Sequence, residues 1–154
     1  MAEVKTRRSL GDDSGAELIE LAIVLPMLLL VFAAIVDFGF LFQRYEVLTN
    51  AAREGARLGV LDGYVEADVD ARVAAYLTAN GLDVTGDPTT VAYSTQELTP
   101  GGKTINVITV TVEYPATFST ITPIAAMVTG GSGFSTLTLR AASTMRTEVV
   151  VAGS

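Results

Sequence analysis

The fold is decided by residues 15–61, which read GAELIELAIVLPMLLLVFAAIVDFGFLFQRYEVLTNAAREGARLGVL. Between Leu18 and Phe42 the ionisable side chains are Glu20 and Asp37 alone. About 25 helical residues at a rise of about 1.5 Å cover about 37 Å, which exceeds the roughly 30 Å hydrocarbon core of a bilayer. The second half keeps helical spacing but becomes polar. The sequence therefore predicts one long helix that spans a membrane and continues into a soluble domain.

A cleaved secretory signal is the main alternative for the apolar run, because basic residues precede it at Lys5, Arg7 and Arg8. Such a signal has a shorter apolar region and ends at a small-residue cleavage site. This run ends instead in an acid and a group of aromatic residues, which is typical of a membrane interface. Those residues are Asp37, Phe38, Phe40, Phe42 and Tyr45. We also expect Pro26 to kink the helix, since it removes one intrahelical hydrogen bond.

Two acids in the apolar run require an explanation, because an ionised carboxylate at membrane depth costs a few kcal/mol. Asp37 lies about 29 Å along the helix from Leu18, so we expect it at the far interface, where water solvates it. Glu20 lies in the first turns, where a helix N-terminus favours negative charge. One interpretation of Glu20 is thus a simple interfacial charge.

The residues before Glu20 point to a second interpretation. Gly15-Ala16-Glu17-Leu18-Ile19-Glu20, at the head of an apolar helix, resembles the type IV prepilin processing site. The resemblance implies cleavage after Gly15, a mature chain that starts at Ala16, and Glu20 as its fifth residue. Cleavage would create an ammonium group on Ala16, and Glu20 would be the counter-charge for a neighbouring subunit's ammonium. Because an unpaired charge in an apolar interior is expensive, such a pair would favour one axial register of helix on helix.

The rest of the stretch is similar to the TadE-like pseudopilins of tight-adherence (Tad) pilus systems. That family has a glutamate-led apolar run with a proline, an acidic-Phe-Gly step and an Asn-Ala-Ala-Arg-Glu-Gly-Ala-Arg helix. One difference is Leu21, where family members more often carry Phe. The matching signature residues are Glu20, Pro26, Asp37, Phe38, Gly39, Asn50, Arg53, Glu54, Gly55 and Arg57.

The resemblance implies a minor pilin or pseudopilin that is processed by prepilin peptidase and supports pilus assembly and surface adherence. Its partners would be the membrane, the peptidase, other pilin or pseudopilin subunits and the Tad assembly platform. It implies a bacterial inner or cell membrane location, crossed once, with possible incorporation into a surface pilus. Orientation follows the Lys and Arg residues of the leader, so we expect a cytoplasmic N-terminus and an extracytoplasmic C-terminal domain. The alternative function is an uncleaved, single-span binding or scaffold protein of a secretion complex.

The amino-acid composition excludes several kinds of catalytic, metal-binding and nucleic-acid-binding site. The 154 residues contain no cysteine and no histidine, which excludes thiolate nucleophiles, imidazole bases and Cys/His zinc sites. A net charge of −7 argues against a nucleic-acid partner, which would require a basic surface. The remaining Ser, Asp and Glu residues are dispersed, so we expect no enzyme activity, no cofactor and no metal site.

The soluble part of the long helix has two distinct faces. A narrow face at i, i+3/i+4 spacing should let a sheet or second helix approach closely; it consists of Leu41, Tyr45, Leu48, Ala52, Gly55 and Gly59. On the polar side, Glu54 and Arg57 are spaced to form an ion pair. Arg53 and Arg57 are interpreted as a solvated face in preference to a docking site for an acidic partner.

Downstream, residues 65–80 predict a second helix, with an apolar stripe of Val69, Val73, Ala74 and Leu77. Residues 89–95 and 103–114 alternate as two strands of an antiparallel hairpin, the second ended by Pro115. The second strand has a more apolar face, which should meet the helix; it consists of Asn106, Ile108, Val110, Val112 and Tyr114. Residues 116–129 are interpreted as a loop with a short helix after Pro123, residues 130–133 as a flexible turn, and residues 134–151 as a last strand.

The expected fold class is α+β, a type IV pilin-like lollipop with an antiparallel sheet of three to four strands. The expected division is a cytoplasmic leader (1–15), a transmembrane helix (16–42), a continuing soluble helix (43–61) and an α+β head domain (62–154).

Overall fold

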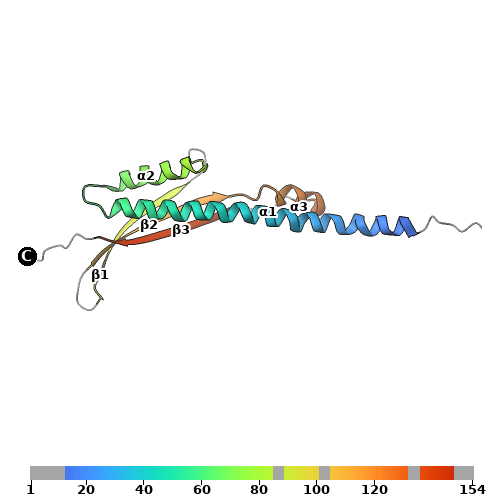
Figure 1. Cartoon of the computed structure of the whole chain (residues 1–154), viewed down its shortest axis with the longest axis horizontal. Helices are drawn as coiled ribbons and strands as arrows, with labels where there is room; N and C mark the ends of the chain where they lie inside the picture. Colours follow the sequence, from blue (N-terminus) through green and yellow to red (C-terminus); the bar gives the residue numbers. More distant parts are fainter. Residues whose placement is uncertain (1–12, 85–88, 101–104, 132–135, 148–154) are drawn as a thin grey trace, which may run out of the picture. The chain divides into compact units, whose positions relative to one another are not determined.

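The computed structural model describes residues 13–84, 89–100, 105–131 and 136–147. They form a long helix, a second short helix, an antiparallel three-stranded sheet and one further helix, which confirms the α+β fold class (Figure 1). In chain order the elements are α1 (Asp13–Gly59), α2 (Glu66–Ala79), β1 (Thr90–Leu98), β2 (Ile105–Ala116), α3 (Ile121–Thr129) and β3 (Leu137–Arg146).

The chain divides into two compact units. In the described residues, the first unit comprises α1 up to Asp37 together with α3, and we call it the helical unit. The second comprises the rest of α1, α2 and the three strands, and we call it the head unit.

The predicted long helix is confirmed as α1, a single helix of 47 residues. It continues through Pro26 without interruption and ends at Gly59, just before the predicted end. It begins at Asp13, so the last residues of the predicted leader are helical, whereas residues 1–12 lie outside the described residues. Its apolar part has a mean hydropathy of 2.8 over an 18-residue window, of which 6% is buried within the chain. By length and composition α1 is therefore able to cross a membrane, and it is the one such helix in the described part of the chain.

The sheet has the strand order β1-β2-β3, with both pairs antiparallel. The predicted hairpin is confirmed, because β1 pairs with β2 from Thr90↔Glu113 to Leu98↔Ile105. The predicted last strand is confirmed as β3, which pairs with β2 from Val107↔Arg146 to Ala116↔Leu137. Of the predicted turn at 130–133, residues 132 and 133 lie outside the described residues.

The prediction that Pro115 ends its strand is wrong. β2 continues to Ala116, and Pro115 is the register partner of Thr138 in β3. Within the described residues β1 pairs with β2 only as far as Glu113, so beyond that residue β3 is the one described strand beside β2. A proline is tolerated in such a position because its missing N–H can face the unpaired side, where no ladder hydrogen bond is lost.

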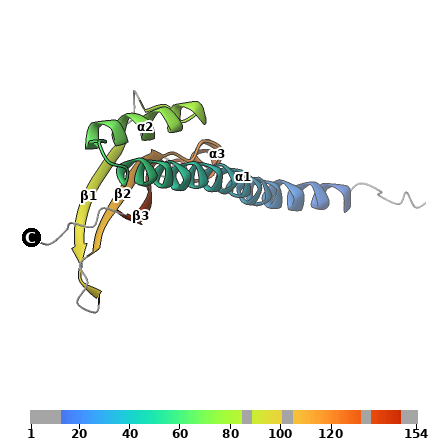
Figure 2. The ribbon, with the colours of Figure 1, turned by 60° about the vertical axis from the view of Figure 1, so that its left-hand side comes forward.

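The core of the head unit lies between one face of β2 and the two helices α1 and α2. The predicted apolar face of β2 is confirmed, since Ile108, Val110, Val112 and Tyr114 are all buried in this core. Figures 1 and 2 both draw α2 beside the C-terminal part of α1. The helices contribute Leu48, Ala51, Ala52 and Ala56 from α1, and Val69, Val73 and Leu77 from α2. Burial of this apolar surface is the main term that stabilises the head unit.

The narrow face of α1 is where α2 and β2 come closest. A Cβ atom added at Gly55 would lie 2.7 Å from Val73 Cγ2 and 3.2 Å from Val110 Cγ1. A Cβ added at Gly59 would lie 3.1 Å from Tyr93 Cε2. The prediction of a close approach along this face is confirmed at Gly55 and Gly59. Tyr45, nearer to the N-terminal end of the face, remains 45% exposed.

The second helix is confirmed as α2, with bounds one residue inside the predicted ones. At its N-terminus the Val65 N–H donates a hydrogen bond to the Asp68 carboxylate at 3.0 Å, and the acidic first turn suits the helix dipole. Gly81 follows the helix with φ +80°, a left-handed conformation that glycine adopts without strain.

Candidate functional site

The predicted processing and assembly residues lie on the first turns of α1. Gly15, Ala16 and Glu20 are all exposed, and a Cβ added at Gly15 would meet nothing within 4 Å. Within the described residues, Glu20 has no hydrogen bond or ion pair. The described part of the chain therefore leaves the exposed Glu20 carboxylate without a partner.

The surface that follows Glu20 is apolar and open. Most of the large apolar side chains along the next turns are exposed within the chain, including Leu21 (54%), Ile23 (67%), Met27 (68%) and Phe32 (64%). Such a large contiguous apolar surface is a liability in water, and it marks a membrane or partner contact. Together with the length of α1, it indicates membrane anchoring.

Asp37 contradicts its sequence-based interpretation. Instead of being solvated at an interface, the side chain is 3% exposed. Its carboxylate accepts hydrogen bonds from the Thr120 N–H (3.0 Å to each oxygen), the Ile121 N–H (2.7 Å) and, at 3.4 Å, the Ser119 hydroxyl. These donors form the N-terminus of α3, whose unpaired N–H groups and dipole favour a negative charge. Asp37 therefore caps α3.

The helix α3 also begins earlier than predicted. It starts at Ile121, so Pro123 lies in its first turn and does not precede it. A proline is compatible with the first turn because N–H groups there have no intrahelical acceptor. The capping carboxylate comes from α1, more than 80 residues away in the sequence, which no local pattern could indicate.

The aromatic residues after Asp37 belong to the head unit. Phe38 makes an edge-to-face contact with Phe118, with ring centroids 6.3 Å apart and planes at 71°, a favoured aromatic geometry. Phe38, Leu41 and Phe42 line an apolar cavity of about 290 Å³ together with Leu137 and Leu139 of β3. A Cβ added at Gly39 would meet nothing within 4 Å, so no close contact within the described chain explains this glycine.

The last signature residues divide between surface and core. Asn50 and Arg53 are exposed, whereas Gly55 is buried. The predicted Glu54–Arg57 pair is confirmed, with Arg57 Nη2 2.9 Å from Glu54 Oε1. A third member of this cluster, Arg72 of α2, is not predicted from the sequence; its Nη2 lies 2.8 Å from the same oxygen.

Glu54 thus links α1 to α2. Hydrogen bonds from Arg57 and Arg72 lower the pKa of the Glu54 carboxyl to about 2, and the same interaction raises the pKa of Arg57. The carboxylate is therefore ionised throughout the neutral and mildly acidic range. The only sequence signal for Arg72 is its position on the polar side of a predicted helix, which does not specify its partner.

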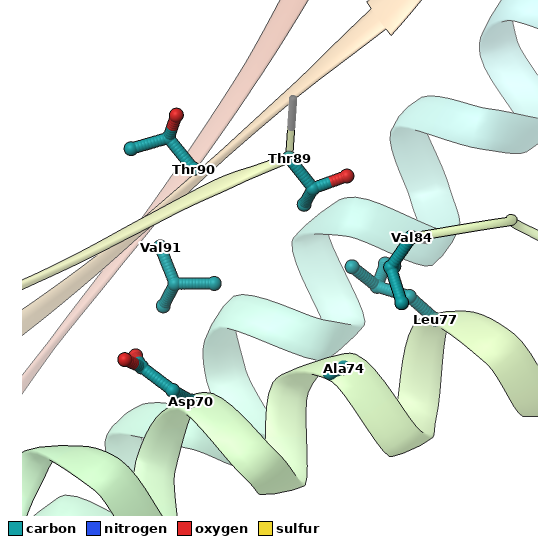
Figure 3. A pocket seen from close by; sticks show the side chains of 7 residues that line it. All are labelled: Asp70, Ala74, Leu77, Val84, Thr89, Thr90 and Val91. Carbon is teal, nitrogen blue, oxygen red and sulfur yellow. The ribbon is translucent and has the colours of Figure 1, made fainter. Parts of the chain in front are cut away.

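A second cavity, of about 420 Å³, lies between α2 and β1 (Figure 3). It is lined by Asp70, Ala74, Leu77, Val84, Thr89, Thr90 and Val91. Asp70 Oδ1 and Thr89 Oγ1 are buried and have no hydrogen-bond partner among the residues that the structure describes. The described residues contain no cluster of three Asp or Glu side chains suited to a metal ion.

Comparison with known protein families gives a match to the N-terminal part of the chain. Residues 15–57 match the model of the family described as TadE-like protein, and this segment contains every predicted site residue from Gly15 to Arg57. No curated protein and no solved structure matches the chain. Over residues 15–57 the chain is therefore similar to TadE-like proteins.

Proposed function

We propose that the chain is a minor pilin or pseudopilin of a Tad-type pilus or secretion system. The observation that carries this proposal is the order of features along α1. An exposed Gly15-Ala16 step comes first, then the unpaired Glu20, then an open apolar surface, and finally the narrow face buried in the head unit. A subunit that must be cut, held in a membrane and packed against copies or relatives needs these features on one helix.

In this proposal the first turns of α1 are acted upon by other proteins. Prepilin peptidase cuts after Gly15, and the exposure of Gly15 and Ala16 is compatible with access to that bond. The new ammonium on Ala16 then meets the Glu20 carboxylate of a neighbouring subunit. A charge pair in an apolar interior fixes one register, since every other register leaves both charges unpaired. The neighbours are other pilin or pseudopilin subunits at the Tad assembly platform.

The proposed location is the bacterial inner or cell membrane, crossed once by residues 16–42. Lys5, Arg7 and Arg8 precede the apolar part of α1, and such residues favour the cytoplasmic side. The N-terminus is then cytoplasmic and the head unit extracytoplasmic, from where the subunit enters a pilus. We assign no enzyme activity to the chain; its residues serve as peptidase substrate and assembly contacts.

A second candidate function is supported by the cavity between α2 and β1. Its two unpaired buried oxygens, Asp70 Oδ1 and Thr89 Oγ1, are suited to a small ligand that donates hydrogen bonds. In that case the chain is an uncleaved, single-span binding or scaffold protein of a secretion complex. The two functions differ at the N-terminus, which is Ala16 in a pilin and unprocessed in an anchored binder.

Deleting the gene for this chain tests the assembly role. We expect the deletion strain to lose surface pili and most of its adherence, because a register-setting subunit is required before others add. A plasmid copy of the wild-type gene should restore both, as measured by counting pili in electron micrographs and by a surface-attachment assay. A deletion strain with normal pili and normal attachment would rule out the proposed role.

A further inference from the structure

The helix α3 lacks the composition of a water-exposed helix. Its sequence is ITPIAAMVT, and residues 115–139 contain no ionisable side chain. On its outer side Met127 is 88% exposed and Val128 53% exposed. A short surface helix in water normally carries charged residues on that side, so this one has an unexplained apolar face.

Within the helical unit α3 lies beside the apolar part of α1, as Figures 1 and 2 both show. One stripe of that part of α1 is less exposed than the rest. The stripe has the spacing of one helix face and is less exposed than its surroundings; it consists of Pro26, Leu30, Ala33 and Asp37. Ala33 is fully buried, whereas its neighbours Phe32 and Ile35 are 64% and 66% exposed. The buried Ala125 of α3 is equally small, as expected where two helices approach closely.

The direction of α3 follows from its two ends. Its N-terminus is held at Asp37, and the covered stripe runs from Asp37 toward the N-terminus of α1. Nine residues of helix extend about 13.5 Å, which is close to half of a hydrocarbon core of about 30 Å. If α1 spans a bilayer with Asp37 near the head side, α3 therefore reaches about the bilayer midplane.

Several backbone groups at the two ends of α3 have hydrogen-bond partners within the protein. At the N-terminus Asp37 accepts the Ile121 N–H, and Pro123 has no N–H to satisfy. At the C-terminus the Gly130 N–H donates to the Ala126 carbonyl at 2.9 Å, and the Thr129 hydroxyl donates to the Ala125 carbonyl at 2.9 Å. Backbone groups in a bilayer must find partners inside the protein, and these contacts supply partners for several of the groups at the two ends of α3.

We propose that α3 is a re-entrant membrane helix that enters the half of the bilayer nearer to Asp37, with its Met127 and Val128 face against lipid acyl chains. This proposal rests on α1 spanning the membrane, and it is independent of cleavage and of pilus assembly. The proposal also explains how the acidic residue Asp37 can lie in the apolar part of α1. Its carboxylate is stabilised by the N-terminus of α3, which lies in the membrane beside α1.

The absence of cysteine from the chain allows a direct test with single-cysteine variants. The variant Met127→Cys carries an environment-sensitive fluorophore, and the full-length protein is reconstituted into phosphatidylcholine–phosphatidylglycerol vesicles. Val31→Cys on the open surface of α1 is the lipid control, and Thr95→Cys on β1 is the water control. We expect Met127 and Val31 labels to be quenched by lipids with mid-chain nitroxides and protected from iodide. The Thr95 label should show the reverse.

Each other outcome overturns the proposal in a distinguishable way. An iodide-quenched Met127 label beside a lipid-quenched Val31 label would place α3 in water while leaving the span of α1 intact. A Met127 label protected from both quenchers would indicate a protein partner in place of lipid. Iodide quenching of both the Met127 and the Val31 labels would contradict the proposal that α1 spans the membrane.

A second variant tests the cap. Adding Asp37→Ala to Met127→Cys should raise the iodide quenching of the Met127 label several-fold, because α3 loses its link to α1. The same substitution added to Val31→Cys should leave that label unchanged. An Asp37→Ala variant with no effect on the Met127 label would show that the carboxylate does not hold α3 in the bilayer.

Discussion

Replacing Glu20 with alanine is expected to leave the protein in the membrane and to remove it from pili. The substitution removes no apolar surface of α1, so membrane insertion is preserved. It leaves the Ala16 ammonium of a neighbouring subunit without its counter-charge in an apolar environment. Breaking a buried ion pair in this way costs about 3 kcal/mol or more, which corresponds to roughly a 100-fold lower incorporation. The measurement is the amount of the chain in sheared pili relative to the membrane fraction.

The matched control is Glu17→Ala, which removes the same type of side chain one turn earlier. Glu17 is exposed like Glu20, and in the proposed function it is not the register residue. We expect this variant to enter pili at the level of the wild type. Incorporation of the Glu20→Ala variant at the wild-type level would contradict the register role of Glu20. An equal loss of incorporation in the Glu17→Ala and Glu20→Ala variants would show that the number of acidic side chains matters and not the position of Glu20.

Replacing Gly55 with alanine is expected to destabilise the head unit by about 1–2 kcal/mol. The new Cβ would lie 2.7 Å from Val73 Cγ2, and valine is stiff at χ1, so it cannot turn aside freely. Overpacking of this kind costs about 1–3 kcal/mol, and the better helix propensity of alanine returns up to about 1 kcal/mol. The measurement is the thermal unfolding midpoint of the full-length protein in detergent, followed by circular dichroism of the sheet.

Two variants make this prediction specific. Gly39→Ala lies on the same helix with nothing within 4 Å of its Cβ, so it should be neutral or slightly stabilising. Adding Val73→Ala to Gly55→Ala removes the clashing methyl group, so the double variant should be more stable than the sum of the two single effects. If the two substitutions change the stability additively, the contact between Gly55 and Val73 does not limit how closely α2 approaches α1.

Much of the fold follows from local patterns in the sequence. The period of the apolar residues predicts α1 and α2, and the alternation in residues 105–114 predicts which face of β2 enters the core. The tapering side chains that end in Gly55 and Gly59 predict the close approach on α1. These features are predictable because each depends on residues a few positions apart.

Other features depend on residues that are far apart in the sequence. Asp37 is expected in water when α1 is considered alone, and it is buried because α3 returns to it from residues 119–121. Arg72 reaches Glu54 across 18 positions, and Pro115 is accommodated because β1 does not extend beyond it. The roles of Gly15, Ala16 and Glu20 belong to contacts with other proteins, so the fold of one chain leaves them as predictions.

The most direct test of the pilin assignment is the N-terminus of the mature protein. The protein is purified from membranes of cells with and without prepilin peptidase, and its N-terminal sequence and intact mass are determined. Our account predicts a chain that starts at Ala16 in the first strain and at Met1 in the second. A chain that starts at Met1 in both strains would contradict it and leave an uncleaved, membrane-anchored protein.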